Sequence, residues 1–424
     1  MTEQTSSPVE LTPSDHTYLH LDTKSSPMHW AMLLELSTDE PPITFDAIRS
    51  RVQERISRYD LFRLVIAQGR WRKPQVSVAD DIDIDRHVSA VDYDDSIDLH
   101  RHVSTRLEAA LPRTNPLWHI TFFTPRVDGA QFVLLRVHHS LSDGIAGAAF
   151  AALLVDGTAD DLDTFDRFAT SPRFRTGDID ADVLKAAKTA FGEQFSAGSK
   201  GRGWPKLTKS GRRDYHLYST STRELRRTAK RNGASVHEFL LAAIGRTLAI
   251  APPPGVAPDV IRVTLPVTND PAFRHTGNAV VVALLNLAGK EPDLARQIER
   301  SRSELAIIDA GKPELATAAP AADSPLPWAL QRVIATAAMS HMSPDIHIGI
   351  NPGFTRVRSV LGSKITDLTA LSPLAGYSFS VTCLILGNRT SLGIVTDPAA
   401  LPDGYAATFA ETLDRVLQEE TVHA

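Results

Sequence analysis

Residues 132–144 read FVLLRVHHSLSDG, and this stretch decides both the fold class and the position of the candidate site. Its first part alternates between two faces with the period of a β-strand, which predicts a strand over residues 132–137. His138 and His139 follow on opposite faces of that strand. The chain after Asp143 is a run of small apolar residues, which predicts a helix with this aspartate available as its N-cap. His139 is therefore expected at the end of an apolar strand, beside the start of a helix.

The four fixed positions of this HHxxxDG motif are His138, His139, Asp143 and Gly144. Taken singly, each is more often a structural residue or a helix cap than a functional group. Together they match by chance only about once in several hundred sequences of this length. A metal site is not expected, because adjacent strand histidines cannot both reach one ion, no HExxH occurs, and the single Cys383 has no CxxC partner. The motif instead indicates acyl-transfer chemistry.

The motif and several other segments resemble the bacterial wax ester synthase/diacylglycerol acyltransferases, within the superfamily of CoA-dependent acyltransferases and peptide-synthetase condensation domains. Residues 116–118 match the family's PLW motif, and residues 277–278 resemble its GN element. Residues 11–15 resemble its opening strand region. One departure is His237-Glu238, which stands where the family usually has Asn-Asp at the start of a helix.

This resemblance implies an α/β fold of two chloramphenicol-acetyltransferase-like subdomains, each a mixed sheet with helices, around a central channel. It also implies an acyl-CoA-dependent O-acyltransferase that moves a long-chain acyl group to diacylglycerol, a fatty alcohol, or both. Acyl-CoA is then a co-substrate, and no bound cofactor is expected. His138 and Gly144 are expected to support the motif, and Asp143 to form an ion pair with an arginine that the sequence does not identify. Candidates for the substrate channel or for motif-specific packing are Pro116, Leu117, Trp118, Gly277 and Asn278.

The chemistry assigns His139 the role of general base. A neutral alcohol is a poor nucleophile, so a base must take its proton as the oxygen attacks the thioester, and histidine titrates close to neutral pH. The resulting imidazolium can return the proton to the leaving thiolate. No covalent acyl-enzyme is expected, and the sequence contains no GxSxG motif.

Two other functions stay open. One is a condensation-type acyltransferase that acts on a carrier-bound or polyketide acyl group. The other is a catalytically silent lipid-binding or lipid-droplet protein, which the departure at His237-Glu238 favours and the intact HHxxxDG motif opposes.

The 424 residues exceed what a single hydrophobic core usually serves, so two domains are expected. Strand-like and helix-like runs alternate in both halves of the chain, as in α/β proteins. We predict an N-terminal subdomain over residues 1–195 that carries the motif, a basic glycine-rich linker over 196–214, and a C-terminal acyltransferase-like subdomain over 215–424.

The net charge of −5 gives no global attraction to nucleic acid, so no such partner is expected. One cysteine suits a reducing compartment. No apolar run approaches the roughly 18 residues of a membrane-spanning helix, and the first residues lack the features of a signal peptide. The expected location is the cytoplasm, with peripheral contact at the inner membrane face or at lipid droplets left open.

Two segments are candidates for such a contact. The linker carries Lys206, Lys209, Arg212 and Arg213, which either form a solvated connector or meet phosphates of a CoA thioester or of anionic lipid headgroups. The helix expected over residues 328–341 carries an apolar stripe, which predicts either core packing or a lipid-facing surface.

Overall fold

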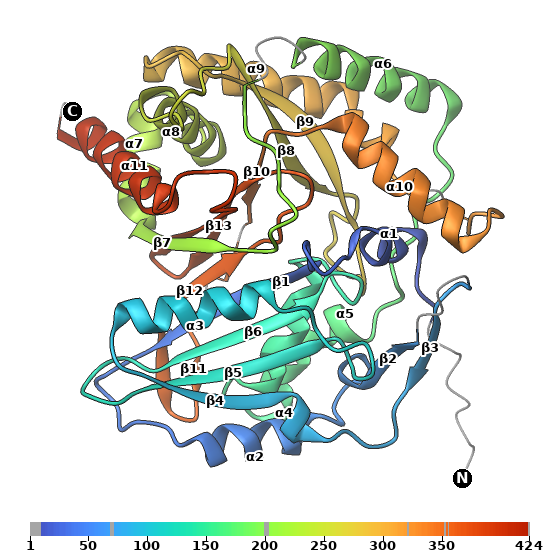
Figure 1. Cartoon of the computed structure of the whole chain (residues 1–424), viewed down its shortest axis with the longest axis vertical. Helices are drawn as coiled ribbons and strands as arrows, with labels where there is room; N and C mark the ends of the chain where they lie inside the picture. The colour runs from blue at the N-terminus through green and yellow to red at the C-terminus, as the bar shows by residue number, and fades with distance from the viewer. Residues whose placement is uncertain are drawn as a thin grey trace.

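The computed structural model describes residues 10–67, 72–198, 203–319, 322–351, 353–354 and 356–422. Two six-stranded sheets form its two halves, the first in the lower part of Figure 1 and the second in the upper part. The first sheet has the order β11-β12-β1-β6-β5-β4, and the second has the order β7-β14-β13-β10-β8-β9. Both sheets combine parallel and antiparallel neighbours. The predicted α/β fold of two mixed-sheet subdomains is therefore confirmed.

The strands of the first sheet are β1 (His29–Leu36), β4 (Val88–Tyr93), β5 (Trp118–Pro125), β6 (Phe132–His138), β11 (Ser359–Val360) and β12 (Ser363–Leu371). Those of the second are β7 (Asp214–Ser221), β8 (Val260–Thr268), β9 (Val280–Ala288), β10 (Ile346–Ile350), β13 (Phe379–Leu386) and β14 (Arg389–Thr396). A separate hairpin joins β2 (Leu64–Ala67) and β3 (Gln75–Val78).

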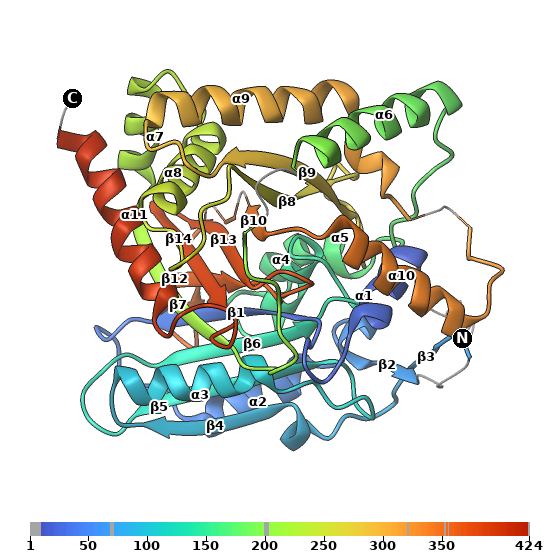
Figure 2. The same cartoon turned by 45° about the horizontal axis from the view of Figure 1, so that its top comes forward.

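The α-helices are α1 (Pro13–Leu21), α2 (Phe45–Arg55), α3 (Ser96–Glu108), α4 (Ala159–Leu162), α5 (Asp166–Ala169), α6 (Ala181–Ala197), α7 (Thr222–Arg231), α8 (Val236–Ile250), α9 (Leu294–Gly311), α10 (Trp328–Met342) and α11 (Tyr405–Val422). The short 3₁₀ helices are η1 (Asp60–Arg63), η2 (Ile84–Arg86), η3 (Ala146–Leu153), η4 (Asp163–Phe165) and η5 (Pro313–Ala316). Helices α7, α8, α9 and α11 surround the second sheet (Figures 1 and 2).

Strand β6 lies in the middle of the first sheet and is covered on both faces. Val133, Leu135 and Val137 belong to one hydrophobic core, whereas Leu134 packs in a second cluster with side chains of α3. The period-two pattern therefore places the motif correctly at the end of a buried central strand. The helix predicted after the motif forms as η3, a 3₁₀ helix that begins at Ala146.

The two sheets do not divide the chain at one point. Strands β11 and β12 come from beyond residue 358, yet β12 pairs with β1 in the first sheet. Residues 215–424 therefore do not form a self-contained unit. The boundary proposed over 196–214 stays a prediction, and residues 199–202 of that linker lie outside the described residues.

The predicted opening strand region is wrong for residues 13–15, which start helix α1. Thr12 is its N-cap, and the Asp15 carboxylate accepts a hydrogen bond from the backbone of Thr12, 2.8 Å long, in a capping box. Strand β1 begins later, at His29. Within the described residues, no helix has both the length and the apolar composition needed to cross a bilayer.

Candidate active site

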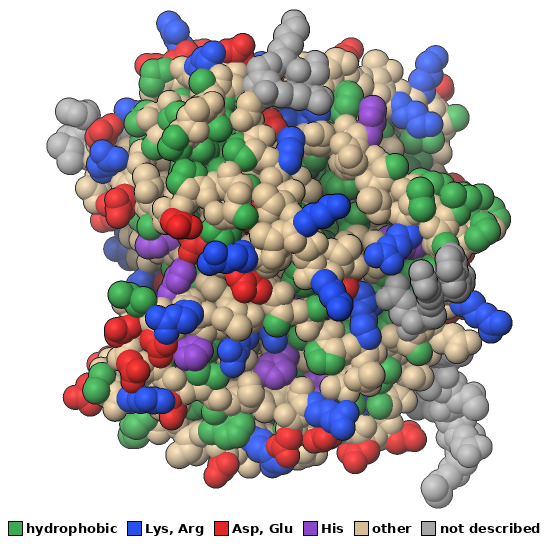
Figure 3. All heavy atoms as spheres, viewed as in Figure 1, with side chains coloured by type: hydrophobic (Ala, Val, Ile, Leu, Met, Phe, Trp, Pro, Cys, Tyr) green, Lys and Arg blue, Asp and Glu red, His purple; other side chains and the backbone are tan. Residues whose placement is uncertain are grey.

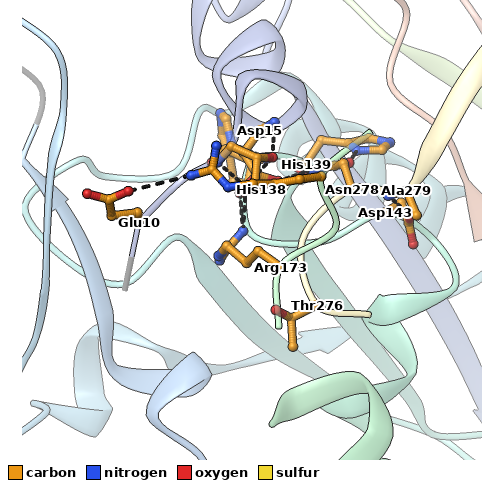
Figure 4. A network of polar contacts seen from close by, with 12 residues as sticks. Glu10, Asp15, His138, His139, Asp143, Arg173, Thr276, Asn278 and Ala279 are labelled. Atoms are coloured by element: carbon orange, nitrogen blue, oxygen red, sulfur yellow. Dashed lines mark hydrogen bonds and ion pairs between the residues drawn. The ribbon is translucent and has the colours of Figure 1, made fainter. Parts of the chain in front are cut away.

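His139 follows the last residue of β6, and one amide fixes its ring. Its Nδ1 atom lies 2.9 Å from Oδ1 of Asn278. Nδ2 of the same amide donates to Oδ1 of Asp15 (2.8 Å) and to the carbonyl oxygen of His139 (2.7 Å). Because both of these partners can only accept, the amide oxygen must face the imidazole and accept from an Nδ1–H group. Nε2 of His139 therefore carries the lone pair that a general base needs (Figure 4).

The His139 ring is also held from one face. The Tyr18 ring stacks on it, with centroids 3.8 Å apart and planes inclined by 8°. Burial lowers the pKa of His139 to about 4, although the hydrogen bond that His139 donates to Asn278 and the charge of Asp143 oppose this shift. The imidazole is therefore neutral at pH 7 and able to accept a proton.

The β8–β9 loop, residues 269–279, brings Asn278 to His139 from the second half of the chain. The backbone N–H of Asp143 donates to the carbonyl of Gly277 (2.9 Å), and Ser142 forms a bridge with Gly277. Gly277 has φ +71°, and a Cβ atom there would lie 2.7 Å from Nη1 of Arg173 and 2.8 Å from Oδ1 of Asp15. Only glycine fits this crossing without strain.

A buried ion pair lies beneath the motif. Nη1 of Arg173 is 2.9 Å from Oδ2 of Asp15, and both side chains are almost fully buried. The same nitrogen donates to the carbonyl of Ser140 (3.4 Å). Arg173 therefore neutralises the carboxylate that orients Asn278, and it contacts the motif turn directly (Figure 4).

The predicted arginine partner of Asp143 is wrong, since His275 takes that place. Oδ2 of Asp143 accepts from Nε2 of His275 (3.0 Å) and from the backbone N–H of Ala279 (2.9 Å). Oδ1 accepts from the N–H groups of Ile145 (2.9 Å) and Ala146 (2.8 Å), so the expected capping role is present. The Asp143 carboxylate thus accepts four hydrogen bonds, two from the β8–β9 loop and two from the start of the segment that follows the motif.

His275 is flanked by two carboxylates. Its Nδ1 atom lies 2.8 Å from Oδ2 of Asp270, opposite the contact with Asp143. Burial lowers the pKa of His275, but the two carboxylates outweigh burial and raise it above its ordinary value. His275 and the backbone donors likewise outweigh burial at Asp143, whose pKa is lowered. Two negative charges around an imidazolium therefore replace the single arginine that was expected.

His138 points away from His139 and is buried. Its Nδ1 atom accepts from the backbone N–H of Ser140 (3.1 Å), and its Nε2 atom faces Oδ1 of Asp22 at 3.5 Å. These contacts tie the motif turn to the end of α1, which agrees with the supporting role predicted for this residue.

Two cavities reach the site. One, of about 620 Å³, is lined mostly by apolar side chains of α1, α6, β9 and α10, and Tyr18 forms part of its wall. The other, of about 320 Å³, is lined by Gly144 of the motif and, among others, by Gly353, Phe354, Arg356 and Arg358. A Cβ atom on Gly144 would meet no atom within 4 Å, so this glycine leaves open space at the end of the motif. In the described ranges, no three His, Cys, Asp or Glu side chains are grouped so that they could hold a metal ion.

Comparison with known proteins finds similarity to one family of acyltransferases. The family model described as the wax ester synthase/diacylglycerol acyltransferase catalytic domain matches residues 11–197. A provisionally named diacylglycerol O-acyltransferase of Mycobacterium tuberculosis is 24% identical over 95% of this chain and 89% of its own length. The chain is therefore similar to wax ester synthases/diacylglycerol acyltransferases, and residues 11–197 match the catalytic domain of that family.

Solved structures show the same fold over nearly the whole chain. The wax ester synthase/diacylglycerol acyltransferase of Marinobacter aquaeolei VT8 aligns with a TM-score of 0.67 at 16% identity, covering 98% of this chain and 99% of that one. The first condensation domain of the calcium-dependent antibiotic synthetase aligns with a TM-score of 0.65 at 16% identity, covering 98% and 97%. The chain therefore shares its two-subdomain fold with this wax ester synthase/diacylglycerol acyltransferase and with condensation domains.

The family's PLW motif belongs to the core rather than to a channel. Leu117 and Trp118 are fully buried, and Nε1 of Trp118 donates to the carbonyl of Phe62 (2.7 Å). The N–H of His138 donates to the carbonyl of Leu117 (2.8 Å), and the N–H of Trp118 to that of Pro116 (2.9 Å). The motif thus fixes the end of β6 through its backbone.

The departure from the family pattern at His237-Glu238 forms an ordinary helix start. Ser235 caps α8, and its backbone N–H donates to Oε2 of Glu238 (2.7 Å) in a capping box. Glu238 also pairs with Arg302 at 3.0 Å. Glu238 therefore stabilises the start of α8 and connects it to α9.

The basic cluster of the linker is only partly free. Nζ of Lys206 is held by Asp345 (2.7 Å) and by the carbonyl of Pro344 (3.0 Å). Arg213 is 4% exposed and donates to the carbonyl of Ser25 (3.0 Å), so it cannot reach a phosphate or a membrane, and that prediction is wrong. Lys209 and Arg212 are exposed.

Sequence reasoning missed several site residues: Asp15, Tyr18, Arg173, His275 and His347. Asp15 had a signal, because Thr-x-x-Asp before an apolar run is a capping-box pattern. His347 lies on β10, where its Nδ1 atom is 3.0 Å from Oγ1 of Thr264. Burial and the charge of His139 lower the pKa of His347 to about 4, so the second subdomain adds a neutral imidazole to the site.

Proposed function

We propose that this protein is an acyl-CoA-dependent O-acyltransferase that moves a long-chain acyl group to diacylglycerol, to a fatty alcohol, or to both. The observation that carries the proposal is the contact between Nδ1 of His139 and Oδ1 of Asn278, which leaves Nε2 as a free base. The apolar cavity of about 620 Å³ beside Tyr18 supports a long alkyl substrate.

In the proposed reaction, Nε2 of His139 takes the proton of the acceptor hydroxyl as its oxygen attacks the thioester carbonyl. A tetrahedral intermediate forms and collapses, the carbon–sulfur bond breaks, and the imidazolium returns the proton to the CoA thiolate. The buried carboxylate of Asp143 favours the transient imidazolium, since its charge raises the pKa of His139.

No covalent acyl-enzyme is part of this proposal, because the acceptor oxygen itself attacks the thioester. Cys383 is a poor nucleophile here, since it is buried on β13 and burial raises the pKa of its thiol to about 12.

We also propose peripheral contact with a lipid surface through α10. Trp328 of this helix packs in the core, whereas Leu326, just before the helix, and Leu330, Val333 and Ile334 on it are 41%, 44%, 62% and 48% exposed. Figure 3 shows hydrophobic side chains gathered at the right edge of the molecule, over α10. Leu326 and Ile334 also line the 620 Å³ cavity, so a lipid leaving that surface would enter beside the active site.

The proposal is tested by incubating purified protein with palmitoyl-CoA and a panel of acceptors, and measuring both CoA release and the lipid product. Formation of triacylglycerol or wax ester at the rate of CoA release supports it. Turnover with a carrier-bound acyl group alone would favour a condensation-type enzyme. Lipid binding without any CoA release would favour a silent protein.

A further inference from the structure

The 320 Å³ cavity carries an unneutralised positive charge that the mechanism above does not use. Its wall includes Gly144 of the motif and the side chains of Arg167, Arg356 and Arg358. Arg167 and Arg358 form no ion pair within the described part of the chain. The sole carboxylate found near Arg356 there is Asp161, at 3.7 Å, and that side chain already accepts two hydrogen bonds from Thr158.

Aromatic rings hold two of these guanidinium groups in place. Arg167 lies over the Phe168 ring, 4.6 Å from its centroid, and Arg358 lies over the Phe165 ring at 4.9 Å. Arg356 is 73% exposed and borders the same cavity. Burial and the charge of Arg356 lower the pKa of Arg358, and the charge of Asp161 opposes this shift only in part.

From this geometry we propose that the three arginines bind the phosphate groups of the CoA moiety of the acyl donor. The planar guanidinium fork matches phosphate oxygens, and three such groups around one cavity suit a polyphosphorylated ligand. Gly144 of the motif lines the same cavity, and the open space beside it leaves room for the uncharged pantetheine arm. The inference rests on the proposed function in that the donor is a CoA thioester.

The division between the two cavities supports this assignment. The larger cavity is lined mainly by apolar side chains and fits an alkyl chain, whereas the smaller one presents cations. Both reach the surroundings of His139, one through Tyr18 and the other through Gly144. A thioester at His139 can then place its acyl chain on one side and its phosphates on the other.

The test compares palmitoyl-CoA with palmitoyl-N-acetylcysteamine, a thioester without phosphates, in the wild type and in an Arg356→Gln/Arg358→Gln double variant. We expect the KM for palmitoyl-CoA to rise about ten- to a hundredfold, because charge-assisted contacts are lost, and kcat to change little. The KM for palmitoyl-N-acetylcysteamine should stay within about twofold. Arg126→Gln is the matched control, since Arg126 is 61% exposed and lines neither cavity.

Direct binding separates this inference from the proposed function. In calorimetry with desulfo-CoA, an unreactive analogue, the wild type should bind about ten- to a hundredfold more tightly than the double variant. Equal affinity, or a KM raised equally for both thioesters, would overturn the phosphate site. A wild type that binds desulfo-CoA through these arginines yet turns over neither thioester would refute the proposed acyl transfer while upholding the site.

Discussion

Replacing Asn278 by alanine removes the acceptor that holds the Nδ1–H group of His139. One neutral hydrogen bond contributes about 0.5–1.5 kcal/mol, which corresponds to a roughly 2- to 13-fold loss in kcat if the bond orients the base in the transition state. The same change leaves Oδ1 of the buried Asp15 without its 2.8 Å donor. We therefore expect Asn278→Ala to lower the free energy of unfolding as well, by about 1–3 kcal/mol.

The pH profile distinguishes a positioning role from a purely structural one. The hydrogen bond that His139 donates to Asn278 raises the pKa of His139, so its loss should move the acid limb of kcat/KM from about pH 4 to lower pH. The matched control is Asn286→Ala, since this buried amide donates to the carbonyl of Gln194 (2.9 Å), away from the motif. It should lower stability and leave the profile unchanged. An Asn278→Ala enzyme with wild-type kcat and an unmoved acid limb would refute the reasoning.

Three further outcomes follow from the contacts around the motif and from α10. Asp143→Asn keeps the shape of the side chain but loses the charge-assisted hydrogen bonds of the carboxylate, so the melting temperature and the activity should fall together. A variant that loses activity at unchanged stability would instead show that Asp143 is catalytic. The pKa of His275 is raised and the pKa values of its carboxylate partners Asp143 and Asp270 are lowered. The loss of unfolding free energy in His275→Gln should therefore be largest between about pH 4 and 6.5 and should shrink at higher pH. A loss that chemical denaturation shows to be independent of pH would exclude the ion pair. Val333→Glu should reduce flotation of the protein with lipid vesicles. Ile97→Glu, at a similarly exposed position on α3, is the control and should not reduce it. Equal effects of the two substitutions would show that α10 is not the surface that contacts lipid.

Local patterns predicted the scaffold of the site well. The alternation in residues 132–137 placed β6, and the same period correctly turned His138 and His139 to opposite faces. These features depend on side-chain direction along one strand, which a sequence specifies directly.

Contacts between distant segments could not be predicted in the same way. His275 lies 132 residues from Asp143, and Arg173 lies 158 residues from Asp15. The first pair forms because the β8–β9 loop crosses to the first half of the chain, and the second because the segment between α5 and α6 returns to α1; no local pattern encodes either approach. The α10 stripe shows the same limit, since a helical period indicates an apolar face but does not reveal whether a partner covers it.

Turnover by a His139→Ala variant tests the central claim most directly, because the claim is that Nε2 of His139 removes the acceptor proton. The measurement is the rate of CoA release from palmitoyl-CoA with saturating acceptor, made beside the wild type and with thermal melting of both proteins. We expect a loss of about 100- to 10,000-fold in kcat with the fold retained. A folded His139→Ala protein that stays within a few-fold of the wild-type rate would contradict the mechanism.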